Sequence, residues 1–450
     1  MLTDTTVISP TSDLIERIGS REALIGVVGL GYVGLPLMLA AVSAKFRVLG
    51  FDINAERVDE INAGKSPLKH ILSVRLLGAR EGGLFEATAD FGRLGEPDAI
   101  LVCVPTPLGP HREPDLDFVA RSMEAIAKRL RRHQLIVLES TSYPGTTSEL
   151  CRPILEAGGM KSGSDFLLAF SPEREDPGNP DFSTSSIPKI VGGDGPDALA
   201  VACALYGAFV ARIIPVSSTE IAEAVKITEN VFRAVNIALV NELKTVFCRM
   251  GIDIFEVIDA AKTKPFGFMA FYPGPGLGGH CIPIDPFYLT WRARGFGIPT
   301  RFIELAGEIN SNMPRWVVDR MVEVLDLRAG KALSQSRLLV IGAAYKKNVD
   351  DMRESPALVI IEMLQRRGAT VDYYDPLVPV IPPTREHSAL AGMKSVAFTP
   401  AVLATYDAAL VVTDHDRIDW QNLVDHARLI VDTRNVKKRV NDPNNKIIVA

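Results

Sequence analysis

A glycine-rich loop carries the cysteine whose setting best suits covalent chemistry. The loop spans residues 272–287 with the sequence YPGPGLGGHCIPIDPF, and Cys281 lies within it. Glycine has no side chain, so a bulky ligand can approach the backbone of this loop closely. An accessible cysteine thiolate is a strong nucleophile. The sequence therefore predicts Cys281 as a nucleophile, with His280 before it and Asp285 after it. His280 is either a ligand or base, or a turn residue that is hydrogen-bonded to the backbone.

Lys226 and Asn230 form a second candidate pair, on a helix predicted over Thr219–Met250. Residues four apart lie on one helix face, so the two side chains could present an ammonium and an amide to a developing oxyanion. Glu223 and Glu229 lie close by in the sequence and favour a plain solvated stripe instead. The spacing alone leaves the solvated stripe ahead of the oxyanion site.

The motif GLGYVG over residues 29–34 matches the pattern GxGxxG between an expected strand and an expected helix. Such a turn brings a dinucleotide pyrophosphate to a helix N-terminus. Asp52 follows the next expected strand, where a carboxylate binds ribose hydroxyls and repels a 2′-phosphate. We therefore predict NAD rather than NADP as cofactor, a preference that the nearby Arg57 weakens slightly. The alternative is a glycine-rich turn in a sheet without a ligand.

These candidates need a scaffold, and alternating strands and helices predict one. Near the N-terminus we expect strands at Ala23–Val28, Arg47–Phe51, Asp98–Val104 and Gln134–Leu138, and helices at Gly34–Lys45 and Asp117–Arg132. Near the C-terminus we expect strands at Arg337–Gly342, Ala369–Tyr374, Asp407–His415 and Ala427–Asn435, and a helix at Ser355–Arg367. This alternation predicts parallel sheets covered on both faces. The shared order suggests a second Rossmann-like unit, although any two parallel sheets would show some similarity.

A helical middle separates the two sets of strands. Besides Thr219–Met250, we expect a helix at Glu304–Leu325, with a helix start or kink at Pro314. The predicted fold class is α/β, with two Rossmann-like doubly wound domains joined by a helical middle domain with a long connecting helix. The predicted domains are residues 22–212, 213–330 and 331–446. A connector of this length often carries a dimer interface, so we expect a homodimer or a higher homo-oligomer.

The second Rossmann-like unit lacks a complete glycine fingerprint. Its first strand is followed by Gly342-Ala-Ala-Tyr345, so a dinucleotide is less expected there. Lys346, Lys347 and Arg353 follow at the edge where open α/β sheets bind ligands. These cations could hold the phosphates of another nucleotide. A solvated charge cluster is an equal alternative, because acidic residues alternate with them.

Composition excludes several classes of protein. The chain has 450 residues, 47% of them hydrophobic and 23% charged, with a net charge of −5, so neither a disordered chain nor a nucleic-acid binder is expected. Its five cysteines form no CxxC pair, which predicts reduced thiols in the cytoplasm and no zinc or other metal site. Residues 23–44 carry no charge and could span a bilayer. Their glycines and Pro36 favour a buried strand, turn and helix, so no membrane partner is expected.

Together these motifs resemble the nucleotide-sugar 6-dehydrogenase family, the UDP-glucose/GDP-mannose dehydrogenases. The resemblance runs from about residue 24 to about residue 436 through GLGYVGLP, CVPTP, ESTSYPGTT, SPERED, VKITENVFRAVNIALVNEL, GGHCIPIDP and GAAYKKNVDDMRESP, in the family's order. It implies an N-terminal NAD domain, a dimerising helical middle and a C-terminal nucleotide-sugar domain. It also implies the family's reaction, a four-electron oxidation of a sugar C6 alcohol to a carboxylate with two NAD+.

The resemblance also implies roles for single residues. Cys281 matches the family's nucleophile, which adds to the C6 aldehyde as a thiohemiacetal and then becomes a thioester. Lys226 and Asn230 match the oxyanion and water-positioning pair. The other catalytic matches are Asp285 as the loop aspartate, Glu173 as activator of water, and Thr141, which helps to hold water and cofactor. The implied cofactor contacts are Gly29, Gly31, Tyr32, Val33, Gly34, Asp52, Arg57, Thr106, Thr141, Glu175 and Arg353. The implied substrate contacts are Glu173, Arg174, Lys226, Asn230, Tyr272, Gly278 and Lys346.

Two departures from the family pattern concern the substrate. Ile284 stands where many UDP-glucose enzymes have lysine, and SPERED is shorter than the family's SPEFLREG. Both favour the branch for N-acetylated sugars, and KTKPFGFMAFYPGPGLGGHC most resembles its UDP-N-acetylglucosamine members. We therefore expect UDP-N-acetylglucosamine, ahead of UDP-N-acetylmannosamine, UDP-N-acetylgalactosamine and UDP-glucose, with a product for surface polysaccharide or O-antigen. The rivals are a two-electron hydroxyacid-type dehydrogenase, which needs no cysteine, and a catalytically silent nucleotide-binding regulator.

Overall fold

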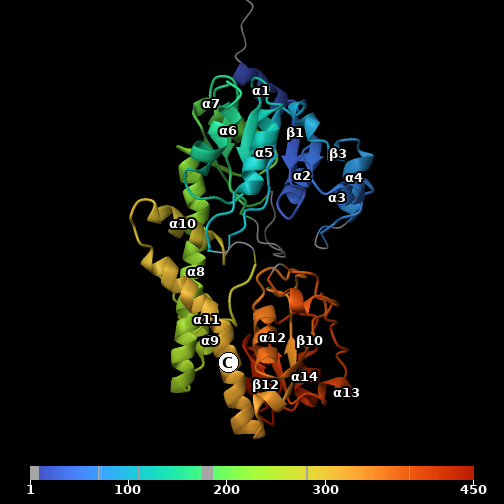
Figure 1. Ribbon diagram of the computed structural model, residues 1–450, viewed down its shortest axis with the longest axis vertical. Coiled ribbons are helices and arrows are strands. Elements are labelled where there is room, and N and C mark those ends of the chain that lie inside the picture. The colour runs from blue at the N-terminus through green and yellow to red at the C-terminus, as the bar shows by residue number, and fades with distance from the viewer. Residues whose placement is uncertain are drawn as a thin grey trace, which may run out of the picture. The chain divides into compact units, whose positions relative to one another are not determined.

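Two compact units make up the computed structural model of the chain (Figure 1). The first comprises Met1–Glu229 and Phe287–Ile298, and the second comprises Asn230–Pro286 and Pro299–Ala450. The structure describes residues 10–68, 71, 73–109, 111–174, 186–279, 282–384 and 386–450. The long helix α8 (Thr219–Met250) and the helix α10 (Asp285–Arg294) each contain residues of both units.

The first unit is built on a sheet that, over the described residues, has eight strands in the order β3-β2-β1-β4-β5-β6-β7-β8. Neighbouring strands are parallel except β6 and β7. The strands are β1 (Leu24–Val28), β2 (Arg47–Phe51), β3 (Phe85–Thr88), β4 (Ala99–Val102), β5 (Leu135–Leu138), β6 (Leu167–Phe170), β7 (Lys189–Gly193) and β8 (Ile213–Val216). The helices are α1 (Pro10–Gly19), α2 (Gly34–Ser43), α3 (Ala55–Asn62), α4 (Ser73–Glu81), α5 (Asp117–Ala127), α6 (Arg152–Glu156) and α7 (Pro196–Gly207).

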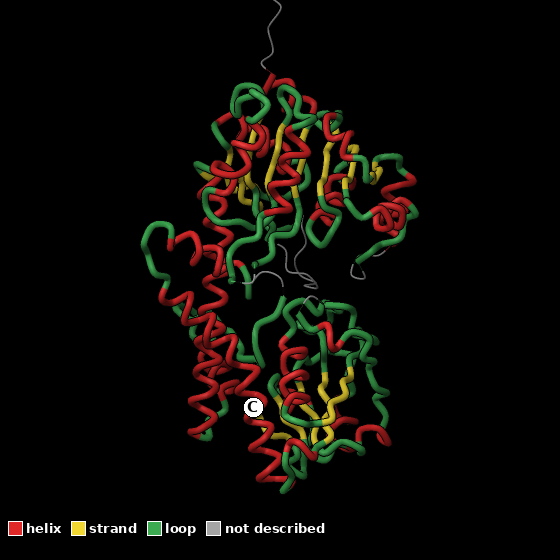
Figure 2. Tube along the Cα trace, in the orientation of Figure 1, coloured by secondary structure: helices red, strands yellow, loops and turns green. Residues whose placement is uncertain are grey.

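The apolar strands of the first unit are buried on both faces, as their uninterrupted hydrophobic runs predict. On β5, Leu135 and Val137 join the hydrophobic cluster on one face of the sheet, while Ile136 and Leu138 join the cluster on the other. Helices lie on both sides of these strands (Figure 2). The uncharged stretch at residues 23–44 thus becomes β1, a turn and α2, as expected.

The second unit contains a parallel sheet with, in the described part of the chain, five strands in the order β10-β9-β11-β12-β13. The strands are β9 (Arg337–Ile341), β10 (Thr370–Tyr374), β11 (Ala408–Val411), β12 (Ile430–Asp432) and β13 (Ile447–Val449). The helices are α9 (Ile254–Ala261), α11 (Arg301–Val324), α12 (Pro356–Arg366), α13 (Pro400–Leu403) and α14 (Trp420–His426). Alternate residues of β9 again divide between two clusters, Leu338 and Val340 on one face, Leu339 and Ile341 on the other.

The predicted fold class is confirmed, with two Rossmann-like sheets and a helical middle. The helix expected at Thr219–Met250 has those bounds. Pro314 lies inside α11, which excludes the helix start and leaves the kink as the remaining prediction at this residue. In the part of the chain that is described, no helix combines the length and hydropathy needed to cross a membrane. The division into residues 22–212, 213–330 and 331–446 stays a prediction.

Candidate active site

The turn after β1 has the shape that a bound pyrophosphate requires. Gly29 has φ +91°, and a Cβ there would lie 2.7 Å from the carbonyl oxygen of Cys103. A Cβ at Gly34 would lie 1.9 Å from the carbonyl oxygen of Gly29, so no larger residue fits at either position. A Cβ at Gly31 would meet nothing within 4 Å. The first and third glycines therefore form the turn, and the second leaves open space where a dinucleotide approaches.

Asp52 follows β2 and is tied to this turn. Its Oδ2 accepts the Leu30 N–H at 3.0 Å, and its Oδ1 accepts the Asn54 N–H at 2.9 Å. The guanidinium of Arg57 lies 3.2 Å from Oδ2. Asp52 itself is 5% exposed. A carboxylate held beside the glycine turn fits the ribose of NAD, and Arg57 is engaged with that carboxylate.

Glu173 and Lys226 form an ion pair in the first unit. Glu173 follows β6, Lys226 lies on α8, and their charged atoms are 3.6 Å apart. Glu173 and Arg174 also line a pocket whose other lining residues are Val33, Leu37, Glu139, Ile187, Pro188 and Lys189. The pocket therefore brings the proposed activator of water next to the glycine motif, as a hydride-transfer site requires.

The solvated-stripe interpretation of α8 was wrong. Lys226 and Asn230 are each 5% exposed, and Glu223 is fully buried. Glu229 is paired with Arg174 at 2.5 Å. Each of these four side chains is therefore buried or ion-paired, whereas the side chains of a solvated helix face would be exposed to water.

Glu223 fastens the segment after β5 to α8. Its Oε2 accepts the Gly145 N–H at 2.6 Å, and its Oε1 accepts the Thr147 N–H at 2.8 Å and the Thr147 hydroxyl at 2.7 Å. Burial raises the pKa of Glu223 to about 7, although these hydrogen bonds oppose the rise. The same segment contains Thr141, which is half-buried. The contact therefore holds the chain around Thr141 to the helix that carries Lys226.

A buried pair of charges supports the strand ends near Glu173. Lys189 on β7 donates to Glu139 at 2.5 Å and to the Pro172 carbonyl at 3.1 Å. The Tyr206 hydroxyl donates to the other oxygen of Glu139. Burial raises the pKa of the Glu139 carboxyl. Since Pro172 immediately precedes Glu173, the pair fixes the backbone on which Glu173 stands.

Thr106 follows β4 and completes the row of predicted residues at the carboxyl ends of the strands. It is 3% exposed, and its carbonyl accepts the hydroxyl of Tyr288 on α10 at 3.0 Å. The glycine turn, Asp52, Thr106 and Thr141 follow β1, β2, β4 and β5 in turn. Ligands of open α/β sheets bind at this edge.

In the second unit, Asn230 is paired with Asp285. The Asn230 amide donates to Asp285 Oδ2 at 2.5 Å, and the two residues are 5% and 1% exposed. The family resemblance implies Asp285 as the loop aspartate, and the structure pairs it with the Asn230 amide. Cys281, His280 and Glu175 lie outside the described residues.

The glycine loop before Cys281 packs on the loop between β9 and α12. The Gly279 N–H donates to the Arg353 carbonyl at 2.9 Å, and a Cβ at Gly278 would lie 2.6 Å from Tyr345 Cβ. Further back in the loop, Tyr272 donates its hydroxyl to Asp259 at 2.7 Å. The glycine at 278 is therefore required for close packing between the two loops.

The basic residues after β9 differ in their exposure and in their ion-pair partners. Lys347 pairs with Asp416 at 2.8 Å and Arg353 with Asp351 at 2.6 Å. Lys347 is exposed, whereas Lys346 is half-buried. The solvated-cluster interpretation therefore fits Lys347, and the phosphate role of Lys346 stays a prediction.

Three segments of the chain match the domains of one family in order. Residues 23–210 match the NAD binding domain, residues 220–312 the central domain and residues 339–439 the UDP binding domain of the UDP-glucose/GDP-mannose dehydrogenase family. The chain belongs to this family. It is therefore a nucleotide-sugar dehydrogenase whose first domain binds NAD and whose last domain binds the UDP part of its substrate.

Relatives within the UDP-glucose/GDP-mannose dehydrogenase family differ in substrate. A UDP-N-acetyl-D-glucosamine 6-dehydrogenase of Pseudomonas aeruginosa is 37% identical over 80% of this chain and 84% of its own. A UDP-N-acetyl-D-mannosamine dehydrogenase of Salmonella typhi is 36% identical over 92% of this chain and 98% of its own. The solved structure of a UDP-D-ManNAc dehydrogenase of Pyrococcus horikoshii aligns with TM-score 0.83 at 32% identity, over 95% of this chain and 98% of that one.

The sequence did not predict the buried charged residues that support the segments carrying the predicted site residues. Glu223 was assigned to a solvated face, and the pair of Glu139 and Lys189 was not identified. A charged residue at the start of an otherwise uncharged strand, as Lys189 is in KIVGG, was the available signal. His415 gave no such signal, because its partners lie 40 and 67 residues away.

Proposed function

We propose that the protein oxidises the C6 hydroxyl of UDP-N-acetylglucosamine to the carboxylate of the uronic acid. Identity to relatives does not separate this substrate from UDP-N-acetylmannosamine, since the two values are 37% and 36%. The substrate proposal is supported by the loop KTKPFGFMAFYPGPGLGGHC and by Ile284 in place of lysine. The observation that carries the chemistry is the presence of two polar pairs, buried Lys226 with half-buried Glu173 and buried Asn230 with buried Asp285.

Cofactor binding falls to the first unit in this proposal. The backbone at Gly29, Gly31 and Gly34 receives the pyrophosphate, and Asp52 accepts hydrogen bonds from the ribose hydroxyls. When bound, NAD+ supplies the hydride acceptor for each of the two oxidations. Thr106 and Thr141 lie at the same edge of the sheet and help to orient the reacting groups.

The first oxidation converts the C6 alcohol to an aldehyde with loss of a hydride and a proton. The ammonium of Lys226 and the amide of Asn230 stabilise negative charge on the C6 oxygen. The Cys281 thiolate then adds to the aldehyde carbon and forms a thiohemiacetal. Covalent attachment keeps the reactive aldehyde on the protein between the two oxidations.

The second oxidation converts the thiohemiacetal to a thioester, again with loss of a hydride and a proton. Water then attacks the thioester carbon, the carbon–sulfur bond breaks, and the carboxylate and the Cys281 thiolate are released. Glu173, whose carboxylate lies 3.6 Å from the Lys226 ammonium, takes the proton from this water. Asp285 orients the Asn230 amide toward the same oxygen.

NADH yield tests the reaction and the substrate together. The purified protein is given limiting UDP-N-acetylglucosamine, UDP-N-acetylmannosamine, UDP-N-acetylgalactosamine, UDP-glucose or GDP-mannose with excess NAD+. We expect two NADH per UDP-N-acetylglucosamine and the highest kcat/KM with that sugar. A preference for another sugar contradicts the substrate proposal, and one NADH per sugar contradicts the four-electron reaction.

Replacement of the nucleophile separates this chemistry from its rivals. Cys281→Ser is expected to lower steady-state NADH formation by about 100-fold or more, because the serine hydroxyl is a weaker nucleophile. Cys248→Ser, on α8, serves as the matched control and is expected to retain activity. Near-normal turnover of Cys281→Ser would favour a two-electron hydroxyacid-type enzyme. A protein that reduces no NAD+ with any nucleotide sugar would instead be a silent regulator.

The proposal includes a homodimer that supplies uronic acids for surface polysaccharide from the cytoplasm. An exposed apolar stripe in the second unit supports self-association, since Phe232, Leu239 and Val246 recur every seven residues along α8. Phe302 and Leu305 add exposed apolar surface on α11. A monomeric mass by light scattering at micromolar concentration would contradict this part of the proposal.

A further inference from the structure

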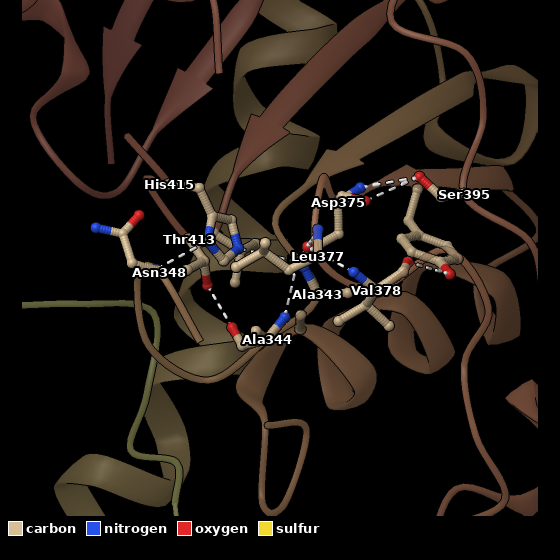
Figure 3. A network of polar contacts seen from close by, with 12 residues as sticks. Ala343, Ala344, Asn348, Asp375, Leu377, Val378, Ser395, Thr413 and His415 are labelled. Carbon is tan, nitrogen blue, oxygen red and sulfur yellow. Dashed lines mark hydrogen bonds and ion pairs between the residues drawn. The ribbon is translucent and has the colours of Figure 1, made fainter. Parts of the chain in front are cut away.

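The buried residue His415, four residues beyond the end of β11, joins two loops of the second unit (Figure 3). Its Nε2 lies 3.0 Å from Oδ2 of Asp375, which follows β10. Its Nδ1 accepts the backbone N–H of Asn348 at 3.0 Å. The residue is fully buried. Both ring nitrogens are therefore used in contacts within the protein.

The partners of His415 determine where its proton lies. A backbone N–H can only donate, so Nδ1 must carry a lone pair. The Asp375 carboxylate already accepts the N–H groups of Ala343 and Ala344 on Oδ2, at 2.7 and 3.0 Å, and those of Leu377 and Val378 on Oδ1, at 2.8 and 3.1 Å. A carboxylate held by four donors is an acceptor for the fifth. Nδ1 of His415 therefore accepts from the turn, and Nε2 is the ring nitrogen that donates to Asp375.

The contact at Asn348 holds a turn in an unusual backbone conformation. Asn348 has φ +62°, a left-handed value that asparagine tolerates better than most residues. Its side chain donates to Asp416 Oδ2 at 2.6 Å and accepts the Asp416 N–H at 3.0 Å. The Thr413 hydroxyl donates to the Ala344 carbonyl at 2.6 Å. The segment after β11 therefore fixes the β9–α12 loop, and His415 fixes its turn.

The loop fixed by His415 carries or contacts the predicted substrate residues. Lys346 lies two residues before Asn348. At the other end of the loop, the Arg353 carbonyl accepts the Gly279 N–H, and Tyr345 packs against Gly278. A change in the turn at Asn348 would therefore be transmitted both to Lys346 and to the glycine loop that precedes Cys281.

We propose that His415 is a positioning residue for nucleotide-sugar binding, acting through its Nδ1 contact to the turn at Asn348. It does not touch the ligand. It holds the β9–α12 loop in the shape that binds the diphosphate of the UDP-sugar, and its contact to Asp375 fixes the orientation of its ring. The inference rests on the proposed function, because it assigns the loop a UDP-sugar ligand.

Two substitutions separate the contacts of His415. In His415→Asn the amide oxygen replaces Nδ1, so the turn contact is retained and the Asp375 contact is lost. In His415→Gln the amide nitrogen replaces Nε2, so the Asp375 contact is retained and the turn contact is lost. We expect the Kd for UDP, measured by calorimetry, to rise about ten-fold in His415→Gln and to stay within about two-fold in His415→Asn.

A purely structural role predicts a different result. Each variant loses one of two buried hydrogen bonds, so such a role would lower the melting temperature and weaken UDP binding about equally in both. Equal Kd values for the two variants, or weaker binding by His415→Asn, therefore overturn the proposal. His426→Gln, at an exposed histidine of α14, is the control and is expected to bind UDP normally.

Steady-state kinetics and the wild-type protein complete the test. We expect His415→Gln to raise KM for the UDP-sugar about ten-fold with kcat reduced less, because saturating substrate restores the loop. A fall in kcat alone overturns the proposal. If the wild-type protein binds no UDP, the proposed function fails together with the inference. If it binds UDP and both variants bind equally, only the inference fails.

Discussion

The two Rossmann-like sheets place an aspartate at the same point and surround it differently. Asp52 follows β2 and Asp375 follows β10, and each accepts an N–H from the turn after the neighbouring strand. Asp52 has as its charged partner Arg57, whose side chain is 39% exposed. Asp375 is enclosed by four backbone N–H groups and His415, with no exposed side-chain surface. We therefore propose that the carboxylate at this point serves a ligand in the first unit and the fold in the second.

The glycines of the two turns differ in the same way. Gly342 corresponds to Gly29, since it has φ +86° and its Cβ would lie 2.4 Å from the Thr413 carbonyl oxygen. The second unit keeps this glycine, and Ala344 stands where the first unit has Gly31. The first glycine therefore belongs to the strand–turn architecture, and we propose that the second serves dinucleotide binding.

The largest effect is expected from replacing the first glycine. Gly342→Ala should destabilise the protein by about 2–4 kcal/mol, because it adds a Cβ at a left-handed position against the Thr413 backbone. Gly31→Ala should leave the unfolding midpoint unchanged and weaken NAD+ binding about ten-fold, since its Cβ would enter only open space. Denaturant unfolding and NAD+ titration measure the two effects. A stable Gly342→Ala variant would break the comparison.

Replacing the aspartate by asparagine should mainly lower stability at Asp375 and mainly raise KM for NAD+ at Asp52. Asp375→Asn should cost about 2–3 kcal/mol of stability, because the new amide would oppose backbone N–H donors. Asp52→Asn should cost less stability and raise KM for NAD+ about ten-fold or more, through lost ribose contacts. Thermal unfolding and initial rates distinguish the two outcomes. An Asp52→Asn variant with normal KM for NAD+ would show that Asp52 serves the fold as well.

The smallest predicted effects are in the pH dependence of stability. Burial raises the pKa of Glu223 from 4.5 to about 7, so its stabilising contribution is present at low pH and is lost as pH rises across that range. Burial opposes ionisation of Asp375, but the His415 and backbone hydrogen bonds lower its pKa. Its contribution is therefore present at neutral pH and is lost as pH falls below about 3.9.

Two variants test whether Glu223 and Asp375 give stability opposite dependences on pH. Glu223→Gln should make the denaturation midpoint less dependent on pH between pH 5 and 7. Asp375→Asn should reduce the loss of stability below about pH 4. Denaturation midpoints across pH 3.5–7.5 supply the measurement. The same pH profile in both variants would contradict the assignment of the two carboxylates.

Local patterns in the sequence were sufficient for α8, for the cofactor turn and for the strands β1, β2, β4, β5 and β9 to β12, whereas β3, β6, β7, β8 and β13 were not predicted. The run of helix formers without glycine or proline gave α8 its bounds, and GxGxxG followed by Asp52 gave the nucleotide edge of the first sheet. The burial of Lys226 and Asn230 did not follow from their spacing, because helical spacing is the same on a solvated face.

The supporting contacts could not be predicted because they join distant parts of the chain. Glu223 meets Gly145 and Thr147 across 78 and 76 residues, and Lys189 meets Glu139 across 50. Such contacts depend on tertiary packing, which periodicity does not encode. Cys281 illustrates the complementary case, since its role was inferred from loop composition and family resemblance alone.

The discontinuous first unit has a consequence for folding during synthesis. The chain leaves this unit at Glu229 and returns only at Phe287–Ile298. The returning segment supplies Tyr288, whose hydroxyl holds the carbonyls of Thr106 and Pro107. A ribosome releases residues in order, so the eight strands emerge before the segment that caps them. The first unit therefore cannot be completed until translation has begun the second. During that interval the carboxyl-end edge of its sheet lacks the contacts that Tyr288 makes with Thr106 and Pro107.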